Sequence, residues 1–306
     1  MRIFTDLSDT DSPNSEHENA RTHTAANLAG VRFIVAVASA KGGAGKSSIA
    51  VNLAVGLALK SRKVAIVDAD LNAPSVLPLL GMKRRLGAPL TDNIEPAAGP
   101  HGLRVVTSDM LPAGEAPPIS FIDNDAALAA ALTNHRRPTV ASRAHALRTL
   151  LSQSRFGALD FLIVDLGPGV GALHEVAALA RIDATLLVSH PSERAGDATR
   201  RAVELALEAV IPIAGIVENF AGYYCDHCRG VRPLLPEGAI VGLTQQFELG
   251  LQARFGFDPR LAESCDRGTL FIRDNPDSPT AKMFAELTLN LERWLAARPT
   301  VSQQSA

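Results

Sequence analysis

Two cysteines lie three positions apart in the stretch YYCDHCRG, residues 223–230, a spacing suited to metal binding. Thiolates hold Zn²⁺ and iron–sulfur clusters, and a closed site normally takes four ligands. Cys225 and Cys228 provide two of them, and the chain has one further cysteine, Cys265. We expect Cys265 to be a small, partly buried apolar residue. The pair is therefore half of a metal site, a redox dithiol or a pair of surface thiols.

A second stretch, SAKGGAGKSS at residues 39–48, has the composition of a phosphate-binding loop. It fits G-x-x-x-x-G-K-[ST] except for Ala40 in place of the first glycine, and it carries an extra lysine. Glycines let backbone N–H groups turn toward phosphate oxygens, and the N-terminus of the following helix adds partial positive charge. Lys46 is expected to reach the β- and γ-phosphates, and the Ser47 hydroxyl to bind Mg²⁺. The predicted nucleotide-binding residues of this stretch are Lys41, Gly42, Gly43, Ala44, Gly45, Lys46, Ser47 and Ser48.

Acidic residues end two of the apolar runs. Asp165 closes the run FLIVD, in the position from which a carboxylate holds Mg²⁺ through a water molecule beside a phosphate loop. Asp68 and Asp70 end the run IVDAD, and residues two apart on an extended segment point to the same side. Either pattern alone also fits a capping or solvated turn. Together with the loop, they predict a magnesium site beside the phosphates of ATP.

The elements that must position these residues are buried strands, because continuous apolar runs recur along the chain with helical patterns between most of them. The predicted strands are residues 31–40, 63–70, 103–108, 159–167, 184–190 and 211–219. The predicted helices are residues 45–62, 144–156 and 192–210, the last with Ser192 as its N-cap. This alternation implies parallel pairing with right-handed crossovers. The predicted fold class is α/β, a doubly wound, mostly parallel sheet flanked by helices, with ligands at the carboxyl ends of the strands.

The composition of the chain limits which binding partners and which cellular compartment we expect for the protein. The formal net charge of −2 gives no general attraction to nucleic acid, so we expect no nucleic-acid partner. The N-terminus has no secretory signal and no apolar run is long enough to span a bilayer, so we expect no membrane partner. Three cysteines are too few for a disulfide framework, which favours the cytoplasm. We divide the chain into a flexible polar arm (1–30), a P-loop ATPase domain (31–298) with the cysteine loop at 223–230, and a disordered tail (299–306).

The motif K-G-G-x-G-K-[ST] resembles the deviant phosphate loop of the MinD/ParA-like ATPases. In that group the first lysine reaches the nucleotide of the partner protomer, which implies this role for Lys41 in a homodimer with two ATP molecules. The resemblance also implies that Asp70 orients the attacking water and that Asp68 belongs to the magnesium shell. Asn219 matches a position that often reads adenine, although it also suits a turn. The implied catalytic residues are Lys41, Lys46 and Asp70.

The later stretch IAGIVENFAGYYCDHCRG resembles the Mrp-type iron–sulfur cluster carriers, in which E-N-M is followed by C-x-x-C. The segments DADLNAPSVLPLLGM and FDPRLAESCDRGTLFI also resemble that family. The resemblance implies that two copies of Cys225 and Cys228 share one [4Fe–4S] cluster across a homodimer. The cluster would come from a donor and pass to apo iron–sulfur proteins. A MinD/ParA-like positioning ATPase and a zinc-linked dimeric nucleotide-binding scaffold remain alternatives.

The family motifs are altered at several positions: the first switch has Ala73 where the carriers have glycine, and the phosphate loop has Ala44 where valine is usual. The second switch of the carriers usually reads D-x-P-P-G-T-G-D, and this chain reads DLGPGVGA. Val170 lacks a hydroxyl that would meet phosphate or water, and Ala172 lacks an acid. The resemblance therefore implies a slow ATPase that keeps its nucleotide binding, with ATP, Mg²⁺ and a [4Fe–4S] cluster as the expected cofactors and cargo.

Overall fold

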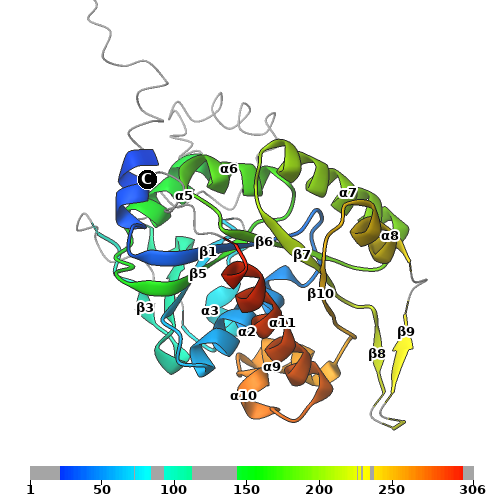
Figure 1. The fold of residues 1–306 in the computed structure, drawn as a ribbon. Coiled ribbons are helices and arrows are strands. Elements are labelled where there is room, and N and C mark those ends of the chain that lie inside the picture. Colours follow the sequence, from blue (N-terminus) through cyan, green and yellow to red (C-terminus); the bar gives the residue numbers. More distant parts are fainter. Residues whose placement is uncertain are drawn as a thin grey trace, which may run out of the picture.

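The computed structural model describes residues 21–71, 73–83, 93–111, 143–225, 227–228, 230–234 and 238–298. Its centre is an eight-stranded sheet in the order β10-β7-β6-β1-β5-β2-β4-β3 (Figure 1). The neighbours in this sheet pair in parallel except β3 and β4, which are antiparallel. The sheet confirms the predicted α/β class with a mostly parallel, doubly wound arrangement.

The strands of the sheet coincide with the apolar runs of the sequence. They are β1 (Val31–Ala38), β2 (Val64–Ala69), β4 (Arg104–Thr107), β5 (Leu159–Leu166), β6 (Ala184–Ser189) and β7 (Ile213–Glu218). All six were predicted, because a strand covered on both faces needs apolar residues at consecutive positions. Two edge strands were not: β3 (Ala97–Ala98) and β10 (Leu251–Arg254). Both are short, and β10 carries polar residues at the sheet edge, so neither has an apolar run.

Helices cover both faces of the sheet (Figure 1). One face packs against α2 (Lys46–Leu59), α3 (Val76–Leu79), α9 (Pro259–Arg267), α10 (Phe271–Asp274) and α11 (Pro279–Ala296). The other packs against α5 (Arg143–Gln153), α6 (Gly171–Leu179), α7 (Glu193–Glu208) and α8 (Ala239–Gln246). Short 3₁₀ turns occupy Pro100–Gly102 and Ser108–Met110. The two faces therefore hold two separate apolar cores, one on each side of the sheet.

Helix ends follow the expected local chemistry. The Ser192 hydroxyl accepts a hydrogen bond from the Ala195 N–H at the start of α7, which confirms the predicted N-cap. The final helix α11 buries an apolar face that includes Phe284, Leu287 and Leu291, so it packs in the core. Among the residues that the structure describes, no helix has the length and apolar character needed to cross a bilayer.

The predicted arm is ordered at its C-terminal end. Residues 21–27 form a helix, and the Asn27 side-chain amide ties its end to the body by donating to the carbonyls of Leu151 and Ser154 at 2.7 and 2.8 Å. Leu28 is buried in the core on the α5 side. Residues 1–20 of the arm and the predicted tail at 299–306 lie outside the described residues.

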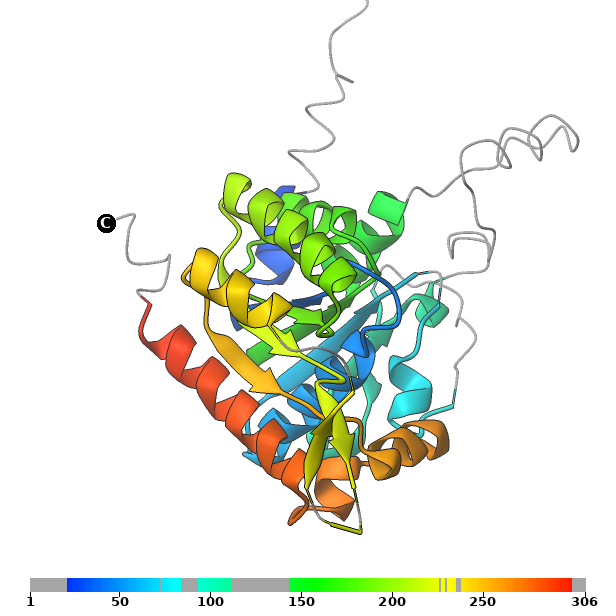
Figure 2. The same ribbon diagram turned by 90° about the vertical axis from the view of Figure 1, so that its right-hand side faces the viewer.

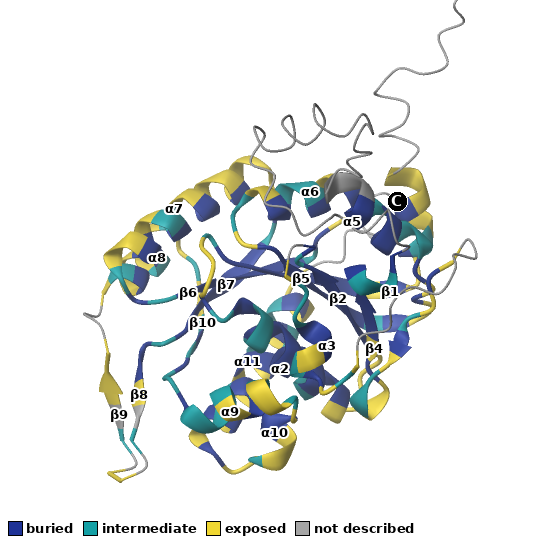
Figure 3. Cartoon of the chain, turned by 180° about the vertical axis from the view of Figure 1, so that it is seen from behind, coloured by how far each residue is buried: buried dark blue, intermediate teal, exposed yellow. Residues whose placement is uncertain are grey.

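A two-stranded antiparallel hairpin extends from the end of β7, beyond the body of the molecule (Figures 1 and 2). Its strands are β8 (Gly222–Tyr224) and β9 (Val231–Pro233), with Tyr223 opposite Arg232. The cysteine pair lies at the far end of β8. The predicted cysteine loop is thus carried by a hairpin that is largely exposed to solvent (Figure 3).

Candidate functional site

The phosphate loop connects β1 to α2 at the carboxyl edge of the sheet. Gly43 and Gly45 adopt left-handed φ angles of 80° and 79°, which few other residues tolerate. The Ser39 hydroxyl donates to the Lys41 carbonyl at 2.9 Å, and this braces the start of the loop. Lys41 is exposed, whereas Lys46 is buried at the first position of α2. The loop geometry is therefore that of a helix N-terminus opening onto a glycine-lined turn.

Lys46 makes a buried ion pair with Asp165. Its Nζ lies 2.6 Å from Asp165 Oδ1, and the two side chains are 7% and 0% exposed. Burial raises the pKa of Asp165, and the ammonium of Lys46 opposes that rise. The other oxygen, Oδ2, is buried and has no hydrogen-bond partner among the described atoms. Such an orphaned oxygen fits a further cation or water at this position.

Asp68 lies beside Asp165 because the parallel pairing of β2 and β5 places them in register. Asp68 is fully buried, and its Oδ2 accepts hydrogen bonds from the Ser75 and Val76 N–H groups at 2.7 and 2.8 Å. Asp68 therefore anchors the start of α3, a contact that the sequence did not indicate. Burial, followed by the nearby charge of Asp165, raises the pKa of Asp68 to about 7.

The stability of the protein should consequently depend on Asp68 between acid and neutral pH. A carboxyl whose pKa rises on folding binds a proton more tightly in the folded state, so its stabilising contribution is complete below about pH 4 and is lost as pH rises toward 7. Asp68→Asn removes that titration and keeps an acceptor for α3. Thermal unfolding from pH 5 to 8 should show wild type losing stability relative to the variant as pH rises. Parallel curves would contradict the assignment.

The pair of buried carboxylates suits a divalent cation. Oxygen ligands from carboxylates and a hydroxyl are those that Mg²⁺ prefers. Asp165 offers its unpartnered Oδ2 as a ligand. The Ser47 hydroxyl lies near that carboxylate, because it is 3.3 Å from the same Lys46 Nζ that pairs with Asp165. Asp68 already accepts three backbone N–H groups, from residues 70, 75 and 76. Asp165 and Ser47 are therefore the better-placed ligands, and Asp68 is a neighbour that adds negative charge.

Asp70 follows β2 and is half-buried. It is near enough to raise the pKa of Asp165 by its charge, and its Oδ1 accepts a hydrogen bond from the Ala73 N–H at 3.3 Å. The structure thus gathers Lys46, Asp70 and Asp165 at one edge of the sheet. The role of Asp70 in orienting water stays a prediction.

Asn219 lies against the phosphate loop. Its Nδ2 donates to the Ala44 carbonyl at 2.9 Å, and its Oδ1 accepts from the Phe220 N–H at 3.0 Å. A Cβ atom at Gly45 would lie 2.2 Å from Asn219 Nδ2, so only glycine fits beneath this amide. The predicted contact of Asn219 with adenine stays a prediction. In the structure, the Asn219 side chain bonds to the backbone of Ala44 and of Phe220.

The two hairpin cysteines are free thiols with different exposure. Cys228 is exposed and Cys225 is half-buried, with its N–H bonded to the Gly230 carbonyl at 3.0 Å. Hydrogen bonds from the Gly230 backbone and the Cys225 side chain, with the nearby Arg232 guanidinium, lower the pKa of the Cys228 thiol. Thiolate character favours metal binding and nucleophilic exchange.

Arg232 was not among the predicted site residues. It stands in β9, opposite Tyr223 of β8, and so comes close to Cys228 only through the hairpin register. Cys265 is half-buried in α9, as expected, and its sulfur lies 3.4 Å from the Ser48 hydroxyl of the phosphate-loop helix. Burial raises the pKa of the Cys265 thiol, the opposite of the effect on Cys228.

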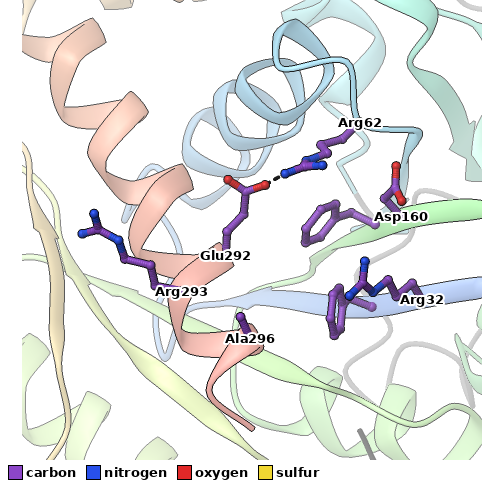
Figure 4. Close-up of a pocket in the computed structure, with 8 residues that line it drawn as sticks. Arg32, Arg62, Asp160, Glu292, Arg293 and Ala296 are labelled. Carbon is purple, nitrogen blue, oxygen red and sulfur yellow. Dashed lines mark hydrogen bonds and ion pairs between the residues drawn. The ribbon is translucent and has the colours of Figure 1, made fainter. Parts of the chain in front are cut away.

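A different hollow lies at the opposite end of the sheet, where β1 and β5 begin (Figure 4). Arg62 and Glu292 pair across it at 2.9 Å, and Arg32 and Asp160 line its side (Figure 4). Because the phosphate loop follows the other end of β1, this hollow is separate from the nucleotide site and contains none of the predicted residues.

Comparisons with known proteins agree with these features. The family model for ParA, described as NUBPL iron-transfer P-loop NTPase, matches residues 30–292. The iron-sulfur cluster carrier protein of Pseudomonas fragi is 31% identical over 271 residues, which are 88% of this chain and 88% of that protein. The carrier protein of Saccharolobus solfataricus is 30% identical over 259 residues, 84% of this chain and 82% of that protein.

Solved structures give the same picture. A nucleotide-binding protein from Archaeoglobus fulgidus, in complex with ADP, superposes with a TM-score of 0.65 and 27% identity over 82% of this chain and 92% of that chain. The cell-division ATPase MinD of Pyrococcus furiosus has a TM-score of 0.59 at 23% identity, over 86% of this chain and 99% of that chain, and shows the shared fold alone. The phosphate loop, the buried Lys46–Asp165 pair and the matched length lead to one conclusion: the chain is a P-loop NTPase of the ParA/MinD type and belongs to the NUBPL iron-transfer family, with iron-sulfur cluster carrier proteins among its relatives.

Proposed function

We propose that the protein is an ATP-hydrolysing carrier that holds one [4Fe–4S] cluster between the cysteine hairpins of two protomers and passes it to apo-proteins. Each protomer contributes Cys225 and Cys228. Transfer is a thiolate exchange: cysteines of the recipient give up protons, bind iron and displace the carrier's thiolates, with no net electron transfer. A cluster donor loads the site by the same exchange in reverse.

The observation that carries this proposal is an incomplete metal site in an exposed position. Within the described residues, no group of three or more His, Cys, Asp or Glu side chains is placed to hold a metal. Cys225 and Cys228 nevertheless interact with each other between β8 and β9, the hairpin that extends from the body in Figure 1. A two-fold axis doubles the thiols to the four that a [4Fe–4S] cluster takes. An exposed cluster suits delivery better than permanent retention.

The nucleotide half of the proposal rests on the loop and the carboxylates beside it. Backbone N–H groups of residues 42–47 and the Lys46 ammonium would bind phosphate oxygens, and Asp70 would orient water toward the γ-phosphate. Mg²⁺, when bound, would offset the negative charge of the phosphates and carboxylates. Catalysis of phosphoryl transfer depends mainly on positioning and charge, so a slow rate is compatible with Val170 and Ala172 in the second switch.

Metal analysis of anaerobically purified protein tests the cargo. The proposal expects iron and acid-labile sulfide, at about four irons for each dimer. Analytical ultracentrifugation with a non-hydrolysable ATP analogue should show a dimer. Zinc without sulfide would instead favour the scaffold. Binding to lipid vesicles in the presence of ATP would favour the positioning ATPase.

Lys41→Ala tests whether catalysis needs the partner protomer. Lys41 is exposed and forms no part of the buried core of the site, so one protomer should still bind ATP with nearly unchanged affinity. Hydrolysis should fall by about a hundredfold, because a positive charge at the transferring phosphoryl group is lost. Turnover and equilibrium binding are measured separately. Lys282→Ala, at a lysine of α11, is the matched control and should match wild type in both.

A further inference from the structure

One side chain joins the phosphate loop to the segment that leads into the cysteine hairpin. Asn219 follows β7, and Cys225 lies six positions later. The Asn219 amide donates to the Ala44 carbonyl at 2.9 Å, across a sequence separation of 175 residues. Asn219 is 7% exposed, and its own N–H donates to the Ser189 carbonyl at 2.7 Å. Burial and this backbone bond to the end of β6 therefore hold Asn219 in place for its contact with Ala44.

This hydrogen bond orients the next peptide group of the loop. The Ala44 carbonyl and the Gly45 N–H belong to one planar trans peptide, in which C=O and N–H point in opposite directions. Because the carbonyl points to Asn219, the Gly45 N–H points to the other side of the loop. Glycine-rich loops bind phosphate through such N–H groups. By binding the Ala44 carbonyl, Asn219 therefore sets the direction in which the Gly45 N–H points.

The residue after Asn219 also contacts both parts. Phe220 has a left-handed φ of 57°, unusual for a residue with a bulky side chain. Its ring atom Cζ lies 3.7 Å from where a Cβ of Gly45 would be. On its other side, the ring centroid lies 6.3 Å from that of Phe257, which stacks on Tyr223 of β8 at 6.4 Å. Backbone strain of this kind persists only where the surroundings hold it in place.

We propose that Asn219 is a positioning residue that aims the Gly45 N–H at the nucleotide phosphates and couples the state of the phosphate loop to the base of the cysteine hairpin. A bound phosphate fixes the Ala44–Gly45 peptide in the orientation that the Asn219 bond needs. The bond from Asn219 to Ala44 then holds Asn219 and Phe220 in place. The contacts of Phe220 with Phe257, and of Phe257 with Tyr223, hold β8. Nucleotide binding should thus make the half-buried Cys225 less accessible. The inference rests on the nucleotide half of the proposed function and does not depend on the cluster.

The test uses cluster-free full-length protein in which Cys228 and Cys265 are replaced by serine, so that a maleimide reports on Cys225. Saturating ADP should slow labelling by about threefold, because the hairpin base opens less often. Asn219→Asp keeps the acceptor for the Phe220 N–H and removes the donor to Ala44. In this variant, ADP should bind about fivefold more weakly, as expected for one lost hydrogen bond, and labelling at saturating ADP should equal labelling without it.

Two further variants separate positioning from a general structural effect. Asn290→Ala removes another side-chain amide that donates to a backbone carbonyl, that of Gln252 at 3.1 Å, far from the loop; it should keep the wild-type response to ADP. Phe220→Gly relieves the left-handed strain and removes the ring, and it should weaken the labelling response while ADP affinity changes little. Retained ADP protection in Asn219→Asp would overturn the proposal, as would wild type that labels equally with and without ADP. Loss of cluster binding in separate assays would overturn the carrier function and leave this inference standing.

Discussion

Cys225→Ser and Cys228→Ser are each expected to abolish retention of the iron–sulfur cluster after anaerobic reconstitution. In the proposed symmetric dimer, each substitution removes two of the four thiolates at once, because both protomers carry it. Serine is a poor ligand for iron beside a soft thiolate. The visible absorbance of the cluster and the bound iron should both fall to the level of untreated protein, from about four irons per dimer in wild type.

Cys265→Ser is the matched control for these variants. Cys265 is half-buried in α9 and bonds to Ser48, so it is separated from the hairpin pair and its replacement should leave the iron content unchanged. A wild-type iron content in either hairpin variant would contradict the shared site. Equal loss in all three variants would point to a folding effect, which thermal unfolding of the apo-proteins measures directly.

Lys46→Met should produce the largest change in nucleotide turnover and in stability together. Lys46 is the charged partner of Asp165 in a pair that solvent barely reaches. Removing one member of a buried pair leaves an uncompensated charge and costs about 3–5 kcal/mol of unfolding free energy. Because we propose that the Lys46 ammonium binds the phosphates, its loss should lower turnover by about a hundredfold or more. Chemical denaturation and phosphate release measure the two effects.

The stability loss should shrink as pH falls. Without Lys46, the pKa of Asp165 rises further, and a protonated Asp165 needs no cationic partner. Lys60→Ala is the control, because Lys60 is exposed to solvent in its pair with Glu292 and surface pairs contribute less than about 1 kcal/mol. A Lys46 variant as stable as the Lys60 variant at neutral pH would show that Asp165 is protonated or otherwise compensated there.

Local patterns were enough for the main strands, the phosphate loop and the position of the cysteine pair. A run such as FLIVD is apolar at every position because the strand is buried on both faces, and that requirement is visible in one segment alone. The left-handed turn at Gly43 and the capping role of Ser192 are likewise set by neighbours in sequence. The short edge strand β10 has no continuous apolar run, so it was recognised as a strand only from its pairing with β7 in the structure.

Relations between distant segments were decided by the tertiary structure. Asp68 and Asp165 become a buried acidic pair only through the register of β2 and β5. Arg232 meets Cys228 only because β9 folds back on β8. The contact of Asn219 with Ala44 depends on the strand order, which brings the ends of β1 and β7 to the same edge. The residue types along the chain therefore determined which chemical groups are present. The packing of the fold determined which of these groups interact, because the energies of burial and charge pairing depend on spatial neighbours that cannot be read from spacing in the sequence.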